Sequence, residues 1–314
     1  MKLIERVFEV NSRADGIKIY PLGDVHIGCT SCAESKFKKM VAKIAKEPNS
    51  YWFGGGDMID GIKLQDVKRS DPNTFPDWLL SGTADNIREN IVNMSSAEAS
   101  RFVEFTKPIA GKCLGLICGN HEHSLRKYHG QDVVAEIVGG LRAEELGRPQ
   151  RFGEKYKGYI EDLTDEFFMR LKFVRKNKRG KTLSSSSVKM YACHGFGGGR
   201  TAGAEPTHLE RLAKGRDVDI VLRGHSHTFH ILPAIVSLTI PNSGKLDGVE
   251  CIHKEKRCGN WGCWVKSNTV GQPTYASMAN YPARSLTTLS VSIRPFAERE
   301  KRLYPKIMLQ EVSL

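Results

Sequence analysis

The chain has 314 residues, 40% hydrophobic and 26% charged, a composition typical of globular proteins and unlike that of disordered or fibrous ones. No apolar run approaches the roughly 18 residues of a membrane-spanning helix, and charges interrupt the N-terminus where a signal peptide needs an apolar segment. We therefore expect a cytoplasmic protein without a membrane-spanning segment. The formal net charge of +12 favours an anionic partner, either nucleic acid, a phosphorylated substrate or an anionic lipid surface, although many basic proteins are merely soluble.

Short apolar runs alternate with amphipathic stretches through the first two thirds of the chain, which indicates an α/β fold. In chain order, the patterns predict a strand over 16–22, a helix over 33–46, a strand over 51–53, an irregular segment over 62–82, a helix over 85–106, a strand over 112–118 and a helix over 131–146. Next come paired strands over 167–174 and 188–193, a helix over 207–214, a strand over 219–222 and β-structure without a helix.

No repeat or long linker divides the sequence, so we expect one domain over residues 1–314. Within it we expect a motif-bearing core over 14–230 and a β-rich C-terminal extension over 231–314. The eight cysteines are interpreted as reduced thiols or metal ligands rather than disulfides.

Five of the expected strands end in a glycine-containing turn that carries Asp, Asn or His. These turns are Asp24-Val25-His26, Gly56-Asp57, Gly119-Asn120-His121, His194-Gly195 and Gly224-His225-Ser226-His227. Each alone is weak evidence, because a single histidine is more often structural than a ligand. In an α/β sheet the carboxyl ends of the strands open on one side. Seven candidate ligands are therefore expected in one crevice: Asp24, His26, Asp57, Asn120, His194, His225 and His227.

Imidazole, carboxylate and amide donors suit Mn, Fe, Zn or Ni. Seven ligands exceed what one tetrahedral ion needs and suit two ions that share a bridging carboxylate. We assign the glycines of these turns to backbone that approaches the ions closely, often with a positive φ that glycine adopts at little cost.

The ordered set Asp-x-His, Gly-Asp, Gly-Asn-His-Glu, His-Gly and Gly-His-x-His, spread over residues 24–227, resembles the calcineurin-like metallophosphoesterase superfamily. The resemblance implies an α/β fold in which two packed mixed β-sheets are flanked by helices, with the metal site at the strand ends. It implies that the first metal is held by Asp24, His26 and His227, the second by Asn120, His194 and His225, and that Asp57 bridges them. His121 matches the superfamily's catalytic histidine, which faces the leaving group, and Asp60 matches an aspartate that supports the turn.

Two divalent ions about 3.5–4 Å apart would activate a bridging hydroxide and polarise a phosphoryl oxygen. His121 would then protonate the departing oxygen or donate a hydrogen bond to it. We expect manganese, with iron, zinc or nickel as alternatives.

The local sequence bears on the substrate. Residues 170–181 contain seven basic residues at an expected hairpin tip that leads toward His194, which suits either a nucleic-acid backbone or a solvated surface. Arg200, which follows a glycine run, and Arg223 are candidate substrate-binding residues, the alternatives being a flexible loop and a paired structural arginine. Phe75 and Trp78 either stack on bases or pin their loop to the core.

The late cysteines suggest a further structural zinc site at Cys251, His253, Cys258 and Cys263, although their spacing is not that of a zinc finger. Cys29 and Cys32 form a Cys-x-x-Cys pair interpreted first as plain loop residues, with a zinc half-site or an oxidation-sensitive pair as alternatives.

We therefore predict a dinuclear metal-dependent phosphoesterase, expected to be a phosphodiesterase or nuclease that acts on nucleic acid. Its Gly-Asn-His motif and basic balance resemble the nucleases of the double-strand-break repair branch. The alternatives are a small-molecule phosphatase, a cyclic nucleotide phosphodiesterase and a non-catalytic nucleic-acid-binding scaffold. A phosphoprotein phosphatase is disfavoured because Gly61 and Ile62 follow Asp60 where that class has Arg-Gly.

Overall fold

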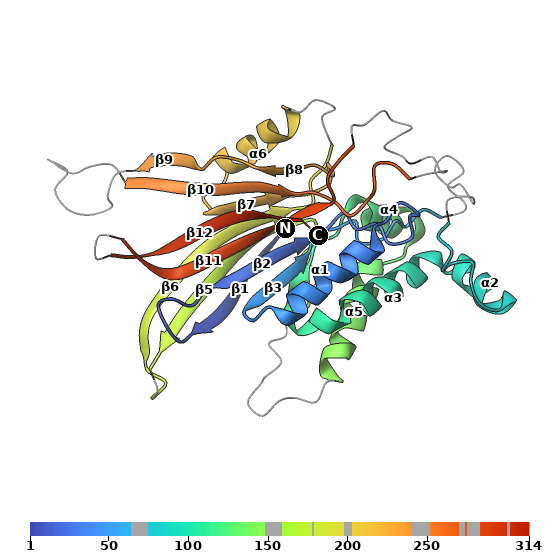
Figure 1. Cartoon of the computed structure of the whole chain (residues 1–314), viewed down its shortest axis with the longest axis horizontal. Coiled ribbons are helices and arrows are strands. Elements are labelled where there is room, and N and C mark those ends of the chain that lie inside the picture. Colours follow the sequence, from blue (N-terminus) through green and yellow to red (C-terminus); the bar gives the residue numbers. More distant parts are fainter. Residues whose placement is uncertain are drawn as a thin grey trace.

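The structure is a computed structural model that describes residues 1–63, 75–147, 159–177, 179–197, 203–239, 252–269, 274, 283–299 and 302–313. Within these ranges, two mixed β-sheets pack face to face and carry helices on their outer faces (Figure 1). The expected two-sheet α/β sandwich is thereby confirmed.

The larger sheet has the strand order β1-β5-β6-β7-β10-β8, and β9 pairs with β10. Its strands are β1 (Lys2–Val10), β5 (Glu166–Lys176), β6 (Thr182–Cys193), β7 (Ile220–Arg223), β8 (Phe229–Ile231), β9 (Ile235–Thr239) and β10 (Ile252–Trp261). The β5–β6 hairpin lies where the apolar patterns predicted paired strands. β1 was not predicted, because charged residues break up its apolar ones, yet it pairs in parallel with β5 along its whole length.

The smaller sheet has the order β12-β11-β2-β3-β4. Its strands are β2 (Ile17–Leu22), β3 (Ser50–Gly54), β4 (Cys113–Leu116), β11 (Thr287–Arg299) and β12 (Arg302–Ser313). β2, β3 and β4 run parallel, so their carboxyl ends lie at one edge. The C-terminal part of the chain contributes to both sheets, since β11 pairs with β2 and β10 pairs with β7.

The described residues also form helices, most of which cover the outer faces of the two sheets. They are α1 (Glu34–Lys46), α2 (Ala84–Val92), α3 (Met94–Thr106), the 3-10 helix η2 (Lys107–Lys112), α4 (Asn120–His129), α5 (Val133–Leu146) and α6 (Ala204–Lys214). α1, α3 and α5 share a core with the smaller sheet, and α6 lies against β7 and β10 of the larger one.

The long helix predicted over 85–106 is wrong in one respect, because the chain forms two helices that meet at Asn93. Asn93 has φ −108° and ψ 36°, and its side-chain amide makes asparagine a poor helix former. Phe102 and Phe105 of α3 are buried, but Ile87 and Ile91 of α2 are only half-buried. α4 was not predicted as a helix at all.

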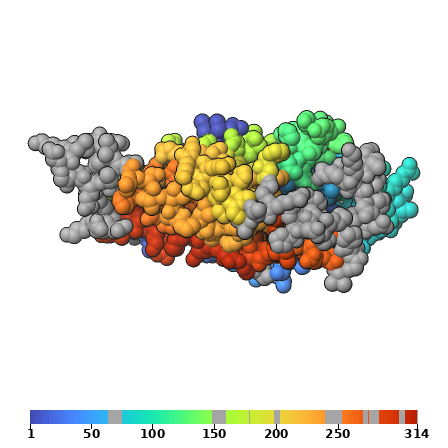
Figure 2. Space-filling model, turned by 90° about the horizontal axis from the view of Figure 1, so that it is seen from above, coloured from blue at the N-terminus to red at the C-terminus, as the bar shows by residue number. Residues whose placement is uncertain are grey.

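The molecule is elongated, with α2 (cyan) at one end and the β9–β10 region (orange) toward the other (Figure 2). Residues of both sheets form the core between them, including Phe8, Phe53, Phe167, Trp261 and Val291. In the described ranges, no helix combines the length and the apolarity that crossing a membrane requires.

Candidate metal centre

The candidate ligands follow the carboxyl ends of five strands. Asp24 and His26 follow β2, Asp57 follows β3, and Asn120 follows β4 at the first turn of α4. From the larger sheet, His194 follows β6, and His225 and His227 follow β7. The site therefore lies where equivalent edges of the two packed sheets meet, as expected of α/β proteins.

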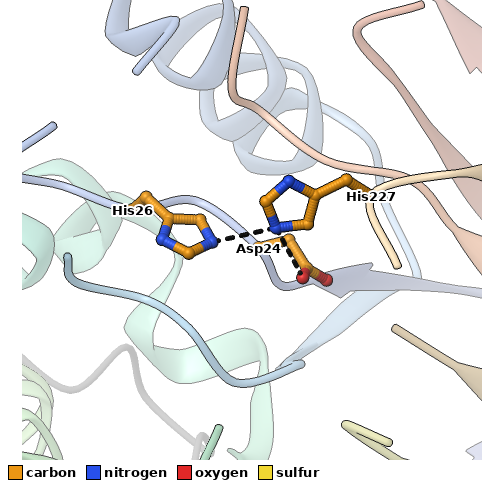
Figure 3. A group of neighbouring side chains, drawn as sticks. All are labelled: Asp24, His26 and His227. Atoms are coloured by element: carbon orange, nitrogen blue, oxygen red, sulfur yellow. Dashed lines mark hydrogen bonds and ion pairs between the residues drawn. The ribbon is translucent and has the colours of Figure 1, made fainter. Parts of the chain in front are cut away.

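The first group of ligand atoms belongs to Asp24, His26 and His227, and these atoms lie within 4.8 Å of one another. The Nε2 atoms of His26 and His227 are 3.1 Å apart, and His227 Nε2 is 3.4 Å from Asp24 Oδ1 (Figure 3). Because the three groups converge on one point from two sheets, a cation would satisfy all of them together.

The second group consists of Asp57, His194 and His225. The amide oxygen of Asn120 joins it, 2.7 Å from His225 Nδ1 and 3.1 Å from His194 Nε2. This set of two imidazoles, a carboxylate and an amide oxygen matches borderline divalent metals such as Mn, Fe, Zn and Ni.

Asp57 lies between the two groups. Its Oδ2 is 3.1 Å from His194 Nε2 and 3.8 Å from His26 Nε2, and the side chain is almost fully buried. One carboxylate is thus within reach of ligands from both groups, which fits two neighbouring ions that share it.

His121 and Asp60 lie beside the first group. The backbone N–H of His121 donates to Asp57 Oδ1 at 3.0 Å, and its ring Nδ1 contacts the carbonyl of Asp60. The His121 ring meets the His26 ring edge-on, with centroids 4.6 Å apart. Asp60 Oδ1 is 3.3 Å from His26 Nδ1, so Asp60 is placed to orient that imidazole.

Burial and charge act against each other at this site. Burial by itself raises the pKa of Asp57, but the charges of His194, His121 and His26 outweigh it and hold the pKa well below its usual value. Burial lowers the pKa of His194, yet the Asp57 charge raises it to about 10. A buried carboxylate therefore faces a protonated imidazole, and a metal ion that binds here must displace that proton.

Five candidate ligands adopt the left-handed backbone conformation. Their φ angles are 51° at Asp24, 53° at His26, 48° at Asp57, 72° at His225 and 56° at His227. Gly56 and Gly195 also have a positive φ, so the turns combine glycines with ligands that adopt this conformation at a higher cost. Such residues cost on the order of 1–3 kcal/mol each and persist only where their surroundings hold them.

Glu122 is a residue of this centre that the sequence interpretation did not assign. Its buried carboxylate accepts the backbone N–H groups of Asp57 at 2.9 Å, Gly119 at 2.8 Å, Met58 at 2.7 Å and Ile59 at 3.3 Å. It therefore joins the turn after β3 to the turn after β4. The signal was the Glu of the Gly-Asn-His-Glu run.

Arg223 is buried rather than open to a substrate. Its guanidinium pairs with Glu205 at 2.6 Å and donates to the carbonyls of Phe196 at 3.1 Å and Gly197 at 2.8 Å. This geometry favours the alternative of a paired structural arginine that holds the loop after His194. Arg200 lies outside the described residues.

The tip of the basic hairpin does not lie beside the site, which favours the alternative of a solvated surface. Between its tip and His194 runs the whole of β6, twelve residues from Thr182 to Cys193, or on the order of 36 Å at the usual rise of a strand. Figure 1 shows the β5–β6 hairpin extending away from α4, toward the lower left. Two of its basic residues pair with β1, Arg170 with Glu5 and Lys176 with Glu9.

Trp78 packs against the helical core, with the Arg101 guanidinium 4.5 Å from its ring centroid, so it pins its loop. Phe75 is half-buried.

The structure does not assemble the additional zinc site among the residues it describes. Cys251 lies outside them. His253 and Cys258 are five positions apart on β10, so they point to opposite faces of the sheet, one exposed and one buried against α6. Cys263 Sγ faces the carbonyl of Val265 instead.

Cys29 and Cys32 are free thiols in the loop after His26. Burial raises the pKa of Cys29 to about 11 and that of Cys32 well above its usual value. Both therefore stay protonated at neutral pH, which disfavours them as metal ligands or reactive thiols.

Residues 17–229 match the family of calcineurin-like phosphoesterases. No curated protein matches the chain in sequence.

Three solved structures are similar over almost the whole chain. They are Vps29 of Chaetomium thermophilum (11% identity, 94% of this chain and 97% of that one, TM-score 0.33), a metallophosphoesterase of Sphaerobacter thermophilus (12%, 95% and 89%, 0.33) and the NAD nucleotidase of Haemophilus influenzae (10%, 95% and 49%, 0.33).

Proposed function

Because the chain belongs to the calcineurin-like phosphoesterases and is a metal-dependent phosphoester hydrolase, we propose that it is a dinuclear phosphodiesterase that acts on nucleic acid. The observation that supports the dinuclear centre is the position of Asp57 between two groups of ligands. Asp24, His26 and His227 would hold one ion, Asn120, His194 and His225 would hold the other, and Asp57 would be shared by both. Manganese is the proposed metal.

When bound, the two ions activate water and neutralise charge on the phosphoryl group. The protein's own contribution is positioning. Glu122 fixes the Asp57 turn through its backbone N–H groups, and Asp60 orients His26. His121 Nδ1 donates to the Asp60 carbonyl, which leaves Nε2 for the leaving oxygen, to which the ring would donate the Nε2 proton of its imidazolium form.

Nucleic acid as the substrate class is supported by two observations. The net charge of +12 favours a polyanion. Phe196, two residues after His194, is 88% exposed, and its ring lies nearly parallel to that of His225, at 13° with centroids 6.4 Å apart. An exposed aromatic ring beside a phosphoester site suits stacking on a base. The tip of the basic hairpin does not support this substrate class, since it lies at the far end of the sheet.

The first test compares hydrolysis of bis-p-nitrophenyl phosphate and p-nitrophenyl phosphate in Mn²⁺. We expect the diester to be preferred and the activity to be lost on chelation and restored by Mn²⁺. Preference for the monoester would overturn the phosphodiesterase proposal in favour of a phosphatase. Absence of turnover with Mn²⁺, Fe²⁺, Zn²⁺ and Ni²⁺ would overturn the catalytic assignment.

The second test uses single-stranded and duplex oligonucleotides with the variant Phe196→Ala. A stacked base contributes roughly 1–3 kcal/mol, so KM for an oligonucleotide should rise by about fivefold or more. Tyr304→Ala, which removes a partly exposed aromatic ring on β12, is the matched control and should leave KM unchanged. Failure to cleave any oligonucleotide while the small diester is cleaved would replace nucleic acid by a small phosphodiester.

A further inference from the structure

Trp261 lies at the end of β10, beyond the residues that match the family. Its side chain is fully buried in the core between the two sheets. The indole Nε1 donates a hydrogen bond to Asp24 Oδ2 at 2.7 Å. A residue of the C-terminal part thus contacts a proposed metal ligand directly.

The ring of Trp261 also lies against three of the turns that carry ligands. A Cβ added at Gly23 would lie 2.7 Å from Nε1, and one at Gly55 or Gly224 would lie 2.8 Å or 2.2 Å from Cζ2. None of these three glycines has a positive φ, so their backbone conformation does not call for glycine. At Gly224 the indole alone fills the space that a side chain would take, and at Gly23 and Gly55 it does so together with the backbone of the other glycine.

The three turns come from both sheets. Gly23 and Gly55 follow β2 and β3 of the smaller sheet, and Gly224 follows β7 of the larger one. Trp261 therefore fills the point at which the two halves of the centre meet. The edge of the Phe53 ring supports the indole, with centroids 5.9 Å apart.

We propose that Trp261 is a positioning residue of the metal centre, which holds Asp24 through its indole N–H and spaces the three turns through its ring. An indole N–H can donate a hydrogen bond but cannot accept one, so Oδ2 of Asp24 is the acceptor. The other oxygen, Oδ1, then faces His227. Contacts of this kind orient metal ligands. The inference rests on the proposed assignment of Asp24 as a ligand.

The test is calorimetric titration of Mn²⁺ into metal-free wild-type protein and into Trp261→Phe. Phenylalanine keeps an aromatic ring against the three glycines and removes only the donor. We expect one of the two Mn²⁺ ions to bind about 10–100-fold more weakly, while the other changes little. Trp52→Phe is the matched control, because Trp52 is equally buried and its Nε1 also donates at 2.7 Å, to the Ile109 carbonyl.

The outcomes separate this inference from the proposed function. Wild-type protein that binds no Mn²⁺ would overturn the dinuclear assignment itself. Two ions bound equally well by the wild type and by Trp261→Phe would overturn the role of Trp261 alone, as would an equal loss of affinity in Trp52→Phe.

A second measurement needs no change at Trp261. In ¹⁵N-labelled wild-type protein, the indole N–H resonance of Trp261, assigned by elimination with Phe variants of the other three tryptophans, should shift when Zn²⁺ is added. The Trp52 resonance should stay in place. An unmoved Trp261 resonance under saturating Zn²⁺ would overturn the proposal.

Discussion

The charged groups at the two ends of the larger sheet differ in burial and spacing. At the carboxyl ends of β6 and β7, a few charged and polar groups are buried, closely spaced and drawn from both sheets. At the other end, the tip of the β5–β6 hairpin carries basic residues that are exposed or paired on the surface, Lys176, Arg179 and Lys181 among them. In the sequence, the basic run is the more conspicuous of the two.

The difference shows that density of charge is a poor guide to chemistry. Exposed charges are screened within about 10 Å at ordinary ionic strength, whereas buried ones act strongly on their neighbours. The Asp57 charge raises the pKa of His194 to about 10 at the buried end, against the effect of burial. Four predictions test this contrast.

Asp57→Asn should have the largest effect, because it removes the carboxylate that the two proposed ion positions share. A metal ion supplies several kcal/mol to the transition state, and each 1.36 kcal/mol is tenfold, so diester turnover should fall at least about 10³-fold. Metal content, measured by mass spectrometry after gel filtration, should fall as well. Asp217→Asn, on an exposed carboxylate paired with Lys189 and Lys254, is the control. Retention of both ions and of most activity would contradict the bridge.

His121→Ala should spare the metals and slow the chemistry. General acid assistance is worth typically 10²–10⁴-fold, and we expect a loss of about 10²-fold in kcat with little change in KM. The loss should shrink for a p-nitrophenyl leaving group, which needs no proton, and grow for an alkyl one. His253→Ala, at an exposed position of β10, is the control. An equal loss for both leaving groups would argue against the role of His121 as an acid.

Glu122→Gln should act through the two turns that its carboxylate joins. An amide group replaces one oxygen, so at least one buried N–H loses its acceptor, and the free energy of unfolding should fall by about 1–3 kcal/mol. Metal affinity should weaken about 10-fold. Urea denaturation and Mn²⁺ titration measure the two effects.

The control for this variant is Glu161→Gln, which weakens the 2.6 Å pair with Arg6 of β1. It should lower the stability and leave metal affinity unchanged. If both variants lower metal affinity equally, Glu122 acts only through global stability.

The double variant Arg179→Ala/Lys181→Ala, at the hairpin tip, should have the smallest effect. Both side chains are exposed and lie far beyond a screening length from His194. Turnover of a small diester should stay within about twofold of the wild type. A clear fall would contradict the separation of the two ends, whereas weaker binding of long strands alone would give the hairpin a role in holding an extended substrate.

Most of the candidate metal centre can be recognised from short stretches of the sequence. A strand that ends at a glycine, followed by Asp, Asn or His, is visible five times, and the shared direction of the strands predicts their convergence. The order of the motifs also predicted the family that residues 17–229 match. The elements that were not predicted are those whose patterns are weak, such as β1 with its interspersed charges, or the break at Asn93, a poor helix former within a continuous apolar pattern.

What the sequence by itself determined was the chemistry of the donors and the strand ends that bear them, because both depend on residues a few positions apart. What only the tertiary structure decided were contacts across the two sheets. Trp261, more than 200 residues beyond Asp24, fills the space left by three glycines, and Arg223 turns inward to Glu205. Likewise, β6 carries the basic tip away from His194, although only the 12 residues of that strand separate the two along the chain. Such outcomes depend on how the sheets pack, which no spacing along the chain records.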